Sequence, residues 1–413
     1  MTIRNQARVV IASIGRFHMF DLARQMARAG LGVSLLTGYP PAKIDYDLRP
    51  LARTHSHWVV FERFVSSLRI GIPPWLPYES VRNFGEWVAR CLDNADVHVF
   101  DALDGGGLEA GRMFRDRGRV WLCNRGSAHV LTQKLLLEEE HRAWRVPMPK
   151  HYFWPANVDR CLAEYGGADG IVVPSRFAAR SFVEQGHPPE KVHVCPYGVD
   201  LSMFRPEPKL DRTFRVLFVG TQSLQKGIGY FFEAVRPLVH SGAIEVWLIG
   251  QAGYDAREIL RKNAGLFRHH GVVPRKKLAW YYSQASVLVL PSIQEGLALV
   301  QAQAMACGIP IVATTNTGAE DLFTDGIEGF IVPIREPGAI REKLQLLLDD
   351  SHKREHMAMA ALHRVVQLGG WSAYGSCVQA LYRDLLQAKR INVSKTSETR
   401  NVSCLRALKA GKA

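Results

Sequence analysis

Short apolar runs and amphipathic segments alternate along the whole chain, starting close to its N-terminus. Residues 8–13 (RVVIAS) are apolar and rich in β-branched side chains, which predicts a buried strand. Residues 20–29 have the spacing of a helix that ends at Gly30, and residues 32–37 predict a second strand. A strand, a helix and another strand in succession are the unit from which parallel sheets are built. The chain therefore begins as a Rossmann-like α/β half.

The same alternation continues into the C-terminal part. Further short apolar runs predict buried strands at residues 97–100, 120–123, 171–174, 215–219, 246–249 and 287–290. After the last of these, residues 297–306 predict a helix that ends at Gly308, and residues 311–313 begin another strand. Gly296 stands at the entrance of this helix, where free backbone N–H groups and the helix dipole favour an anion such as phosphate.

Length and composition set the class of protein. A chain of 413 residues predicts two domains of roughly 200 residues each. Apolar residues make up 47% and charged residues 22%, as in folded proteins, and no apolar run reaches the roughly 18–20 residues that cross a bilayer. The N-terminus lacks the pattern of a signal peptide, and the seven cysteines show no paired spacing. We therefore expect a cytoplasmic protein with reduced thiols, no disulfide and no zinc site.

A net charge of +13 indicates anionic partners. Nucleic acid, an anionic membrane surface and nucleotide diphosphates all fit this charge. The sequence has neither a helix-turn-helix pattern nor the interleaved aromatic and basic residues of single-strand binders. This excludes nucleic acid as the favoured partner and leaves a phosphorylated donor or the inner face of a membrane.

Candidate chemistry in the N-terminal half follows the predicted strands. The first turn, residues 13–18, lacks the G-x-G-x-x-G of a dinucleotide site. Arg125 and His129 follow the strand at 120–123, where α/β folds place ligands, and both are candidates for the cleft. Asp45-Tyr46-Asp47 matches a D-x-D metal motif but follows no apolar strand, so we interpret it as a chance match and expect no metal.

Two charged or aromatic segments have simpler interpretations. Residues 138–141 (EEEH) lie on a predicted helix, and such runs are usually a solvated face. Residues 58–92 mix aromatic and basic side chains, which predicts either an amphipathic helix pair packed on the N-terminal half or, less favoured, a membrane-facing surface.

The segment 291–310 resembles the donor-site motif of retaining glycosyltransferases with the GT-B fold, in the large group that includes family 4. That motif reads P-S-x-x-E-G-x-x-L-V-x-x-E-A-M-A-x-G-x-P. The matching residues are Pro291, Ser292, Glu295, Gly296, Leu299, Val300, Ala304, Met305, Ala306, Gly308 and Pro310. Gln303 stands where the family has its second glutamate, so the Glu-x7-Glu pair becomes Glu-x7-Gln.

Two further segments carry the resemblance. Residues 175–206 are similar to the hinge of the family, with Ser175, Gly186, Lys191, Pro196, Gly198, Val199, Asp200, Phe204 and Pro206 in the matching positions. Residues 220–227 resemble the loop Gly-Arg-x-x-x-x-Lys-Gly that neutralises the diphosphate of the donor. Lys226 matches its lysine, whereas Thr221 replaces its arginine.

This resemblance implies an α/β protein of the GT-B fold, with two Rossmann-like domains that face each other across a cleft. The acceptor-binding domain is expected at residues 1–196 and the nucleotide-sugar domain at 197–370. A helix at 371–388 would cross back to the N-terminal domain, and the basic tail at 389–413 would be disordered.

The resemblance also implies roles for individual residues. Glu295 would hold donor sugar hydroxyls, Lys226 would stabilise the leaving diphosphate, and either His129 or Arg125 would take the position of the family histidine near the transferred sugar. The other binding candidates are Gly15, Arg16 and His18 in the first turn, and Thr221, Val272, Gly296, Leu297, Ala298 and Gln303 in the C-terminal half.

The implied reaction is retaining, hexosyl-type transfer from a nucleotide-diphosphate sugar to a saccharide or lipid-linked acceptor, without a cofactor. Polysaccharide or glycolipid synthesis at the inner membrane face is the expected setting. Three other interpretations remain open. They are a GT-B-fold epimerase or phosphorylase, a weakened nucleotide-sugar-binding protein, and a basic membrane- or nucleic-acid-binding protein.

Overall fold

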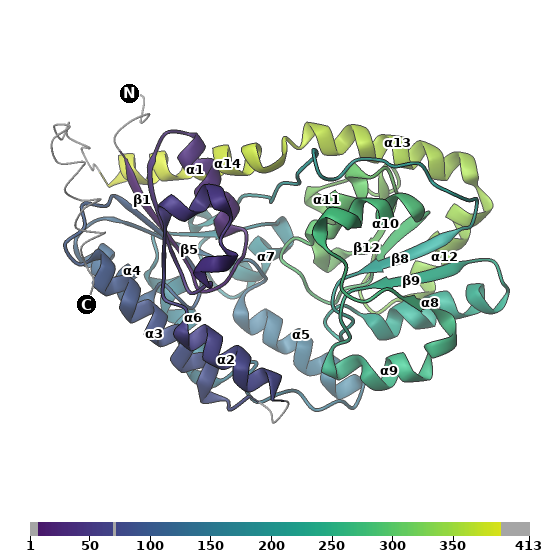
Figure 1. Cartoon of the computed structure of the whole chain (residues 1–413), viewed down its shortest axis with the longest axis horizontal. Helices are drawn as coiled ribbons and strands as arrows, with labels where there is room; N and C mark the ends of the chain where they lie inside the picture. The colour runs from purple at the N-terminus through teal and green to yellow at the C-terminus, as the bar shows by residue number, and fades with distance from the viewer. Residues whose placement is uncertain (1–6, 69–71, 390–413) are drawn as a thin grey trace.

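A computed structural model describes residues 7–68 and 72–389 and contains two parallel sheets covered by helices (Figure 1). The seven-stranded sheet has the order β3-β2-β1-β4-β5-β6-β7, and the six-stranded sheet has the order β10-β9-β8-β11-β12-β13. All strand pairs are parallel, as the alternation of strands and helices in the sequence predicts. The expected α/β fold with two Rossmann-like halves is confirmed.

The N-terminal half contains the seven-stranded sheet. Its strands are β1 Arg8–Ser13, β2 Gly32–Thr37, β3 Ala52–Thr54, β4 Val99–Leu103, β5 Val120–Asn124, β6 Gly170–Val173 and β7 Val192–Val194. Its helices are α1 Met19–Arg28, α2 His57–Ser67, α3 Trp75–Leu92, α4 Leu108–Asp116, α5 Val130–Ala143, α6 Pro155–Gly167 and α7 Arg176–Glu184.

The C-terminal half contains the six-stranded sheet. Its strands are β8 Arg215–Val219, β9 Glu245–Ile249, β10 Arg268–His269, β11 Val287–Leu290, β12 Ile311–Thr314 and β13 Gly329–Val332. The remaining helices are α8 Ile228–His240, α9 Arg257–Lys262, α10 Leu278–Gln284, α11 Leu299–Ala306, α12 Pro337–Asp349, α13 Ser351–Gln367 and α14 Gly370–Ala388.

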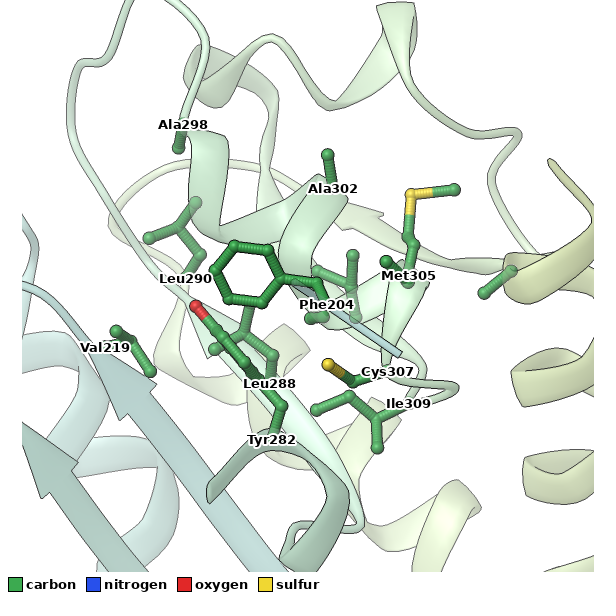
Figure 2. Close-up of a cluster of buried hydrophobic side chains, with 14 of the residues drawn as sticks. Phe204, Val219, Tyr282, Leu288, Leu290, Ala298, Ala302, Met305, Cys307 and Ile309 are labelled. Carbon is green, nitrogen blue, oxygen red and sulfur yellow. The ribbon is translucent and has the colours of Figure 1, made fainter. Parts of the chain in front are cut away.

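The hinge segment is anchored in the core of the C-terminal half. Figure 2 shows Phe204 among Tyr282, Leu288 and Leu290, and its side chain is almost fully buried. Burying a phenylalanine contributes about 1.5–3 kcal/mol, which holds the chain at the point where it enters this half. The Phe-x-Pro of the hinge motif therefore has a packing role.

Helix α14 returns to the N-terminal half, as predicted (Figure 1). It packs against α1, where a Cβ at Gly375 would lie 2.5 Å from Gln25 Cβ, so the two helices approach closely. Its Tyr382 hydroxyl donates a hydrogen bond of 2.8 Å to Asp101 Oδ2 in the middle of β4. This helix therefore ties the end of the described chain to the first sheet.

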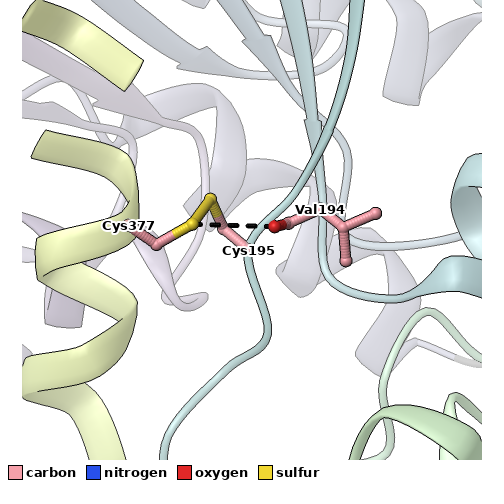
Figure 3. Close-up of a disulfide and its surroundings, with 3 residues drawn as sticks. All are labelled: Val194, Cys195 and Cys377. Atoms are coloured by element: carbon pink, nitrogen blue, oxygen red, sulfur yellow. Dashed lines mark hydrogen bonds between the residues drawn. A yellow bond between two sulfur atoms is a disulfide. The ribbon is translucent and has the colours of Figure 1, made fainter. Parts of the chain in front are cut away.

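Two expectations are wrong. A disulfide joins Cys195, directly after β7, to Cys377 in α14 with a Cα–Cα distance of 5.9 Å, although the cysteine spacing predicted none (Figure 3). Residues 138–141 are not a solvated face throughout, because Glu140 and His141 are buried against the C-terminal half.

Three further features complete the fold. The predicted helix pair at 58–92 is present as α2 and α3, which pack on each other. None of the helices in the described ranges is both long and apolar enough to cross a membrane. The basic tail expected to be disordered lies, from residue 390 onward, outside the described residues.

Candidate active site

A cavity of about 580 Å³ lies between the two halves. It forms where the carboxyl ends of strands from both sheets face each other, which is the usual position of a ligand in open α/β folds. The N-terminal half contributes Arg16, Phe17, His18, Asp21, Leu103, Asp104, Arg125, Gly126, Ser127, Gln133 and Tyr197, and Trp371 follows at the start of α14. The C-terminal half contributes Arg275, Leu297, Leu299 and Gln303.

Lys226 and Glu295 meet in an ion pair on the C-terminal side. Lys226 comes from the loop after β8 and Glu295 from the loop after β11, and these two strands are neighbours in the sheet. Glu295 Oε1 also accepts a hydrogen bond of 3.1 Å from Ser292 Oγ. The sheet thus brings together the two residues to which the sequence assigned the leaving group and the sugar.

Gly227 explains why the Lys226 loop requires a glycine. Its φ is +67°, in the left-handed region, and a Cβ there would lie 2.0 Å from the carbonyl oxygen of Pro291. The loop after β8 therefore touches the loop after β11 directly. This contact holds Lys226 beside Glu295.

Gly296 lies where the two halves touch. A Cβ on it would stand 2.1 Å from the carbonyl oxygen of Gly126, and Ser175 Oγ donates a hydrogen bond of 2.6 Å to the Gly296 carbonyl oxygen. Leu297, the next residue, lines the cavity. Ala298 is extended and precedes α11, so the helix begins two residues later than predicted.

The ion pair lies beside the cavity and is not part of its wall. Glu295 is flanked by Leu297, which lines the cavity, and by Gln294, whose Nε2 donates a hydrogen bond of 2.5 Å to Ser127 Oγ in the opposite wall. A ligand that fills the cavity and reaches past Ser127 would meet the Lys226–Glu295 pair.

Gln303 lines the cavity, as the resemblance suggests, and its amide has a defined orientation. The hydroxyl of Tyr282 donates a hydrogen bond of 2.9 Å to Gln303 Oε1. With the oxygen engaged in this way, the amide NH₂ remains to face a ligand. A glutamate here would offer a charged acceptor, whereas this glutamine offers a neutral donor.

His18 lines the opposite wall and is held in one tautomer. Its Nε2 lies 2.7 Å from Asn124 Oδ1, and the Asn124 amide donates to Asp101 Oδ1 at 3.4 Å. Asn124 Oδ1 therefore accepts, so Nε2 carries the proton and Nδ1 has its lone pair free. The ring stacks on Tyr197 at 4.4 Å, and burial lowers the pKa of His18 to about 4. His18 is thus a neutral hydrogen-bond acceptor.

Arg16 and Gly15 belong to the same turn. Arg16 lines the cavity but forms an ion pair of 2.7 Å with Asp45, and Asp47 pairs with Arg24 at 2.6 Å. The D-x-D segment therefore binds arginines. No group of three potential metal-ligating side chains occurs in the part of the chain that the structure describes.

Of the two residues proposed after β5, Arg125 reaches the cavity and His129 does not. Arg125 forms an ion pair with Asp104 and donates to Gln133 Oε1 at 2.5 Å, which leaves little of its guanidinium for a ligand. His129 is 1% exposed and caps α5, because its Nδ1 accepts from the Leu131 N–H at 3.2 Å.

The packing around His129 sets its ionisation. Its ring lies among Tyr165, Phe182 and His187, at centroid distances of 4.9–5.4 Å. Desolvation in this apolar cluster lowers the pKa of His129 to about 4. The residue is therefore neutral and buried behind the cavity wall.

Thr221 and Val272 also lie outside the cavity wall. Thr221 is half-buried after β8, and the side chain of Val272 is 74% exposed. Thus the structure gathers Arg16, His18, Arg125, Leu297 and Gln303 around one cavity, and the Lys226–Glu295 pair beside it.

Several cavity residues were missed by the sequence analysis. Asp104 follows β4, Tyr197 belongs to the hinge motif, Trp371 begins the returning helix, and Arg275 precedes α10. The hinge motif identified the segments where the chain passes between the halves. It gave no sign that these segments also form the wall of the cavity.

The fold and site define a two-domain α/β protein of the GT-B type with an interdomain ligand cavity. Residues 16–203 match the family model described as Glycosyltransferase Family 4, and residues 213–350 match the one described as Glycosyl transferases group 1. The chain belongs to the family-4-like glycosyltransferases, and the expected resemblance is confirmed.

Individual relatives agree with this. The D-inositol 3-phosphate glycosyltransferase of Frankia alni is 26% identical over 406 residues, which cover 91% of this chain and 95% of the relative. That of Thermomonospora curvata is 30% identical over 237 residues, which cover 50% of this chain and 55% of the relative.

Solved structures share the fold. Sucrose-phosphate synthase from Thermosynechococcus elongatus superimposes with a TM-score of 0.71 at 19% identity, over 93% of this chain and all of that chain. Anabaena Alr3699/HepE in complex with UDP-glucose gives a TM-score of 0.64 at 14% identity, over 91% of this chain and 99% of that chain.

Proposed function

We propose that this glycosyltransferase transfers a hexosyl group from a nucleoside diphosphate sugar to a hydroxyl of a saccharide or lipid-linked acceptor, with retention at the anomeric carbon. The observation that carries the proposal is the Lys226–Glu295 pair, which lies beside an interdomain cavity. In this proposal Lys226 is the cation that binds the diphosphate, and Glu295 is the carboxylate that binds sugar hydroxyls.

The chemistry assigned to the chain is electrostatic. The bond between the anomeric carbon and the diphosphate oxygen breaks, and a bond to the acceptor oxygen forms on the same face of the sugar. The acceptor hydroxyl proton passes to the departing phosphate. Lys226 stabilises the negative charge that grows on the leaving group, and backbone N–H groups near Gly296 assist it. His18 accepts a hydrogen bond from a sugar hydroxyl.

The donor and acceptor classes have separate support. The similar Anabaena protein was solved with UDP-glucose, so UDP-glucose is the first donor to test. The relatives named for D-inositol 3-phosphate act on a phosphorylated polyol, so polyols and saccharides are the first acceptors. A product whose anomeric coupling in ¹H NMR equals that of the donor would support retention, and an inverted coupling would contradict it.

Removal of either charged residue tests the site. We expect Lys226→Ala and Glu295→Ala each to lower the rate of sugar transfer at least about tenfold, because each removes a contact to the reacting groups. The measurement is release of labelled sugar product at saturating donor, with circular dichroism to check folding. The exposed pair Lys262 and Glu258, 3.7 Å apart on α9, supplies matched controls as Lys262→Ala and Glu258→Ala. Unchanged turnover in either site variant would remove that residue from the mechanism.

A weakened nucleotide-sugar-binding protein is the second candidate. Two replacements favour it, because Thr221 and Gln303 stand where the family has a cation and a carboxylate. An assay with labelled donor, with and without acceptor, separates these functions, since a binder releases no product. Conversion of the donor sugar without acceptor would instead indicate an epimerase, and exchange with inorganic phosphate a phosphorylase.

We also propose that α2 contacts an anionic membrane surface when the acceptor is lipid-linked. Helix α2 has no buried residue, and its Val60, Phe61 and Phe64 are 47–58% exposed beside Arg63. Apolar and basic side chains on one exposed helix suit a lipid interface. Sedimentation with phosphatidylserine vesicles should exceed that with phosphatidylcholine vesicles, and Phe61→Ser with Phe64→Ser should abolish the difference. Equal sedimentation with both lipids would contradict it.

A further inference from the structure

Helix α5 begins in the N-terminal half and ends against the C-terminal half (Figure 1). Its first turn contributes Gln133 to the cavity wall, where Gln133 accepts a hydrogen bond from Arg125. Its far end, residues 140–144, contacts α8, the helix that follows the Lys226 loop. A helix of 14 residues spans about 21 Å, so α5 connects two separate parts of the site.

The first contact is between Trp144 and the start of α8. Gly229 is the second residue of α8 and lies three positions after Lys226. A Cβ on Gly229 would lie 2.1 Å from Trp144 Cζ2, so the indole ring packs directly on the helix backbone. The same ring meets Tyr230 edge-on at 5.5 Å. Any side chain at position 229 would push the indole away from the donor loop.

The second contact is a buried ion pair. Glu140 is fully buried, and its Oε1 accepts a hydrogen bond of 2.5 Å from Arg335 Nε of the C-terminal half. Arg335 Nη2 also donates to Glu139 Oε2 at 2.9 Å. Burial of a carboxylate costs several kcal/mol unless a partner compensates, so Glu140 depends on Arg335. The contact thus fixes one relative position of the two halves.

Backbone geometry marks the same place. Within residues 7–68 and 72–389, two residues other than glycine have a positive φ, Arg145 at 56° and Arg335 at 65°. One directly follows Trp144 and the other pairs with Glu140, so each half contributes one of them. Such conformations cost about 1–3 kcal/mol each and persist where the surroundings hold them firmly. Strain of this kind gathers at functional sites.

We propose that Trp144 and Glu140 are positioning residues for Lys226. Helix α5 contacts Arg125 at its start and, at its far end, α8, which follows the donor loop at residues 220–227. Lys226 is correctly placed only when the contact between α5 and α8 is made. The kinetic part of this proposal, an effect on sugar transfer, rests on the proposed function. Its structural part, order in the Lys226 loop, can be measured without any substrate.

The structural test is hydrogen–deuterium exchange on the full chain. Trp144→Ala should speed exchange of peptides covering residues 220–230, while peptides from α13 stay unchanged. Trp144→Phe, which keeps an aromatic ring, and Glu138→Gln, on the exposed face of the same helix, should leave exchange unchanged. Glu140→Gln keeps the side-chain shape and removes the charge, and it is the test variant if Trp144→Ala fails to fold. Unchanged exchange in residues 220–230 for both Trp144→Ala and Glu140→Gln would overturn the proposal.

The kinetic test is a double-mutant cycle. Trp144→Ala should lower kcat about tenfold and change the donor KM less than about twofold, because misplacement of Lys226 affects mainly the leaving group. In the Lys226→Ala background the same substitution should have almost no further effect. Fully additive losses would overturn the proposal, since α5 would then act elsewhere. Faster loop exchange in a protein that transfers no sugar would support the positioning contact and refute the proposed function.

Discussion

The side chain of His18 illustrates how individual residues set the chemistry of the cavity. A chain of hydrogen bonds runs from Tyr382 through Asp101 and Asn124 to His18. Burial raises the pKa of Asp101 to about 7 and lowers that of His18 to about 4. The two shifts have opposite effects on the pH dependence of stability, so only a variant isolates the contribution of His18.

We expect His18→Gln to reduce the loss of stability in mild acid. The unfolded chain binds a proton at His18 below pH 6.5 and the native protein only below about pH 4, so the native state loses stability as the pH falls across this window. The shift corresponds to up to about 3 kcal/mol. Urea unfolding of both proteins between pH 7 and pH 4 measures it. Parallel curves would show that His18 does not titrate in this way.

Glycines and charged motif residues could be predicted from the sequence, whereas buried charges could not. Gly227, Gly296 and Lys226 stand in an ordered pattern of neighbouring residues, so local sequence identifies them. Glu140 looks like any solvated glutamate, because its partner Arg335 lies 195 residues away in the other half. The burial of His129 could not be predicted for the same reason, because the residues that cover it belong to α6 and α7 rather than to the preceding strand β5.

At the scale of elements, a covalent bond holds α14 to the end of β7. The disulfide between Cys195 and Cys377 closes a loop with a sequence separation of 182. A bridge across a long loop restricts the unfolded chain and typically contributes about 2–4 kcal/mol. It joins the two segments by which the chain leaves and re-enters the N-terminal half.

We expect dithiothreitol to lower the unfolding free energy of the oxidised protein by about 2–4 kcal/mol. Cys377→Ser should show the same loss without reductant and no further loss with it. Chemical denaturation with and without reductant measures both values, and Cys91→Ser, at a free thiol, is the control. Equal stability of the oxidised and reduced protein would show that the bridge contributes nothing.

Periodicity predicted the long elements and missed the short ones. The strands with four or more apolar residues were found, since they are buried on both faces. β3 and β10 were missed because they contain three and two residues. β13 was also missed, because it has four residues and begins at Gly329, a residue type that is rare in strands.

At the scale of the whole molecule, two sets of segments connect the N-terminal and C-terminal halves. The hinge, with α14 and the disulfide, lies on one side of the view in Figure 1, and α5 lies on the other. The parallel sheets made the existence of two halves predictable. Their relative placement depends on contacts such as Ser127 with Gln294 and Trp144 with Gly229, which no local pattern reveals.

The proposed donor site lies at the junction of the halves, so nucleoside diphosphates should raise the melting temperature. A ligand at about 100 times its Kd stabilises the native state by about 2.7 kcal/mol. Thermal-shift measurements with UDP, GDP and ADP would rank the bases, and uridine is the control without phosphates. Lys226→Ala should reduce the shift. An equal shift in that variant would place the diphosphate elsewhere.

The close packing of Gly198 against Gly370 and Trp371 has a consequence for the evolution of this chain. A Cβ on Gly198 would stand 2.0 Å from the Trp371 nitrogen. The segment that leaves the N-terminal half and the segment that returns to it are therefore in direct contact. The chain therefore enters and leaves the C-terminal half at one place. Recombination at this contact would exchange the whole C-terminal half for that of a relative and leave the N-terminal half unbroken.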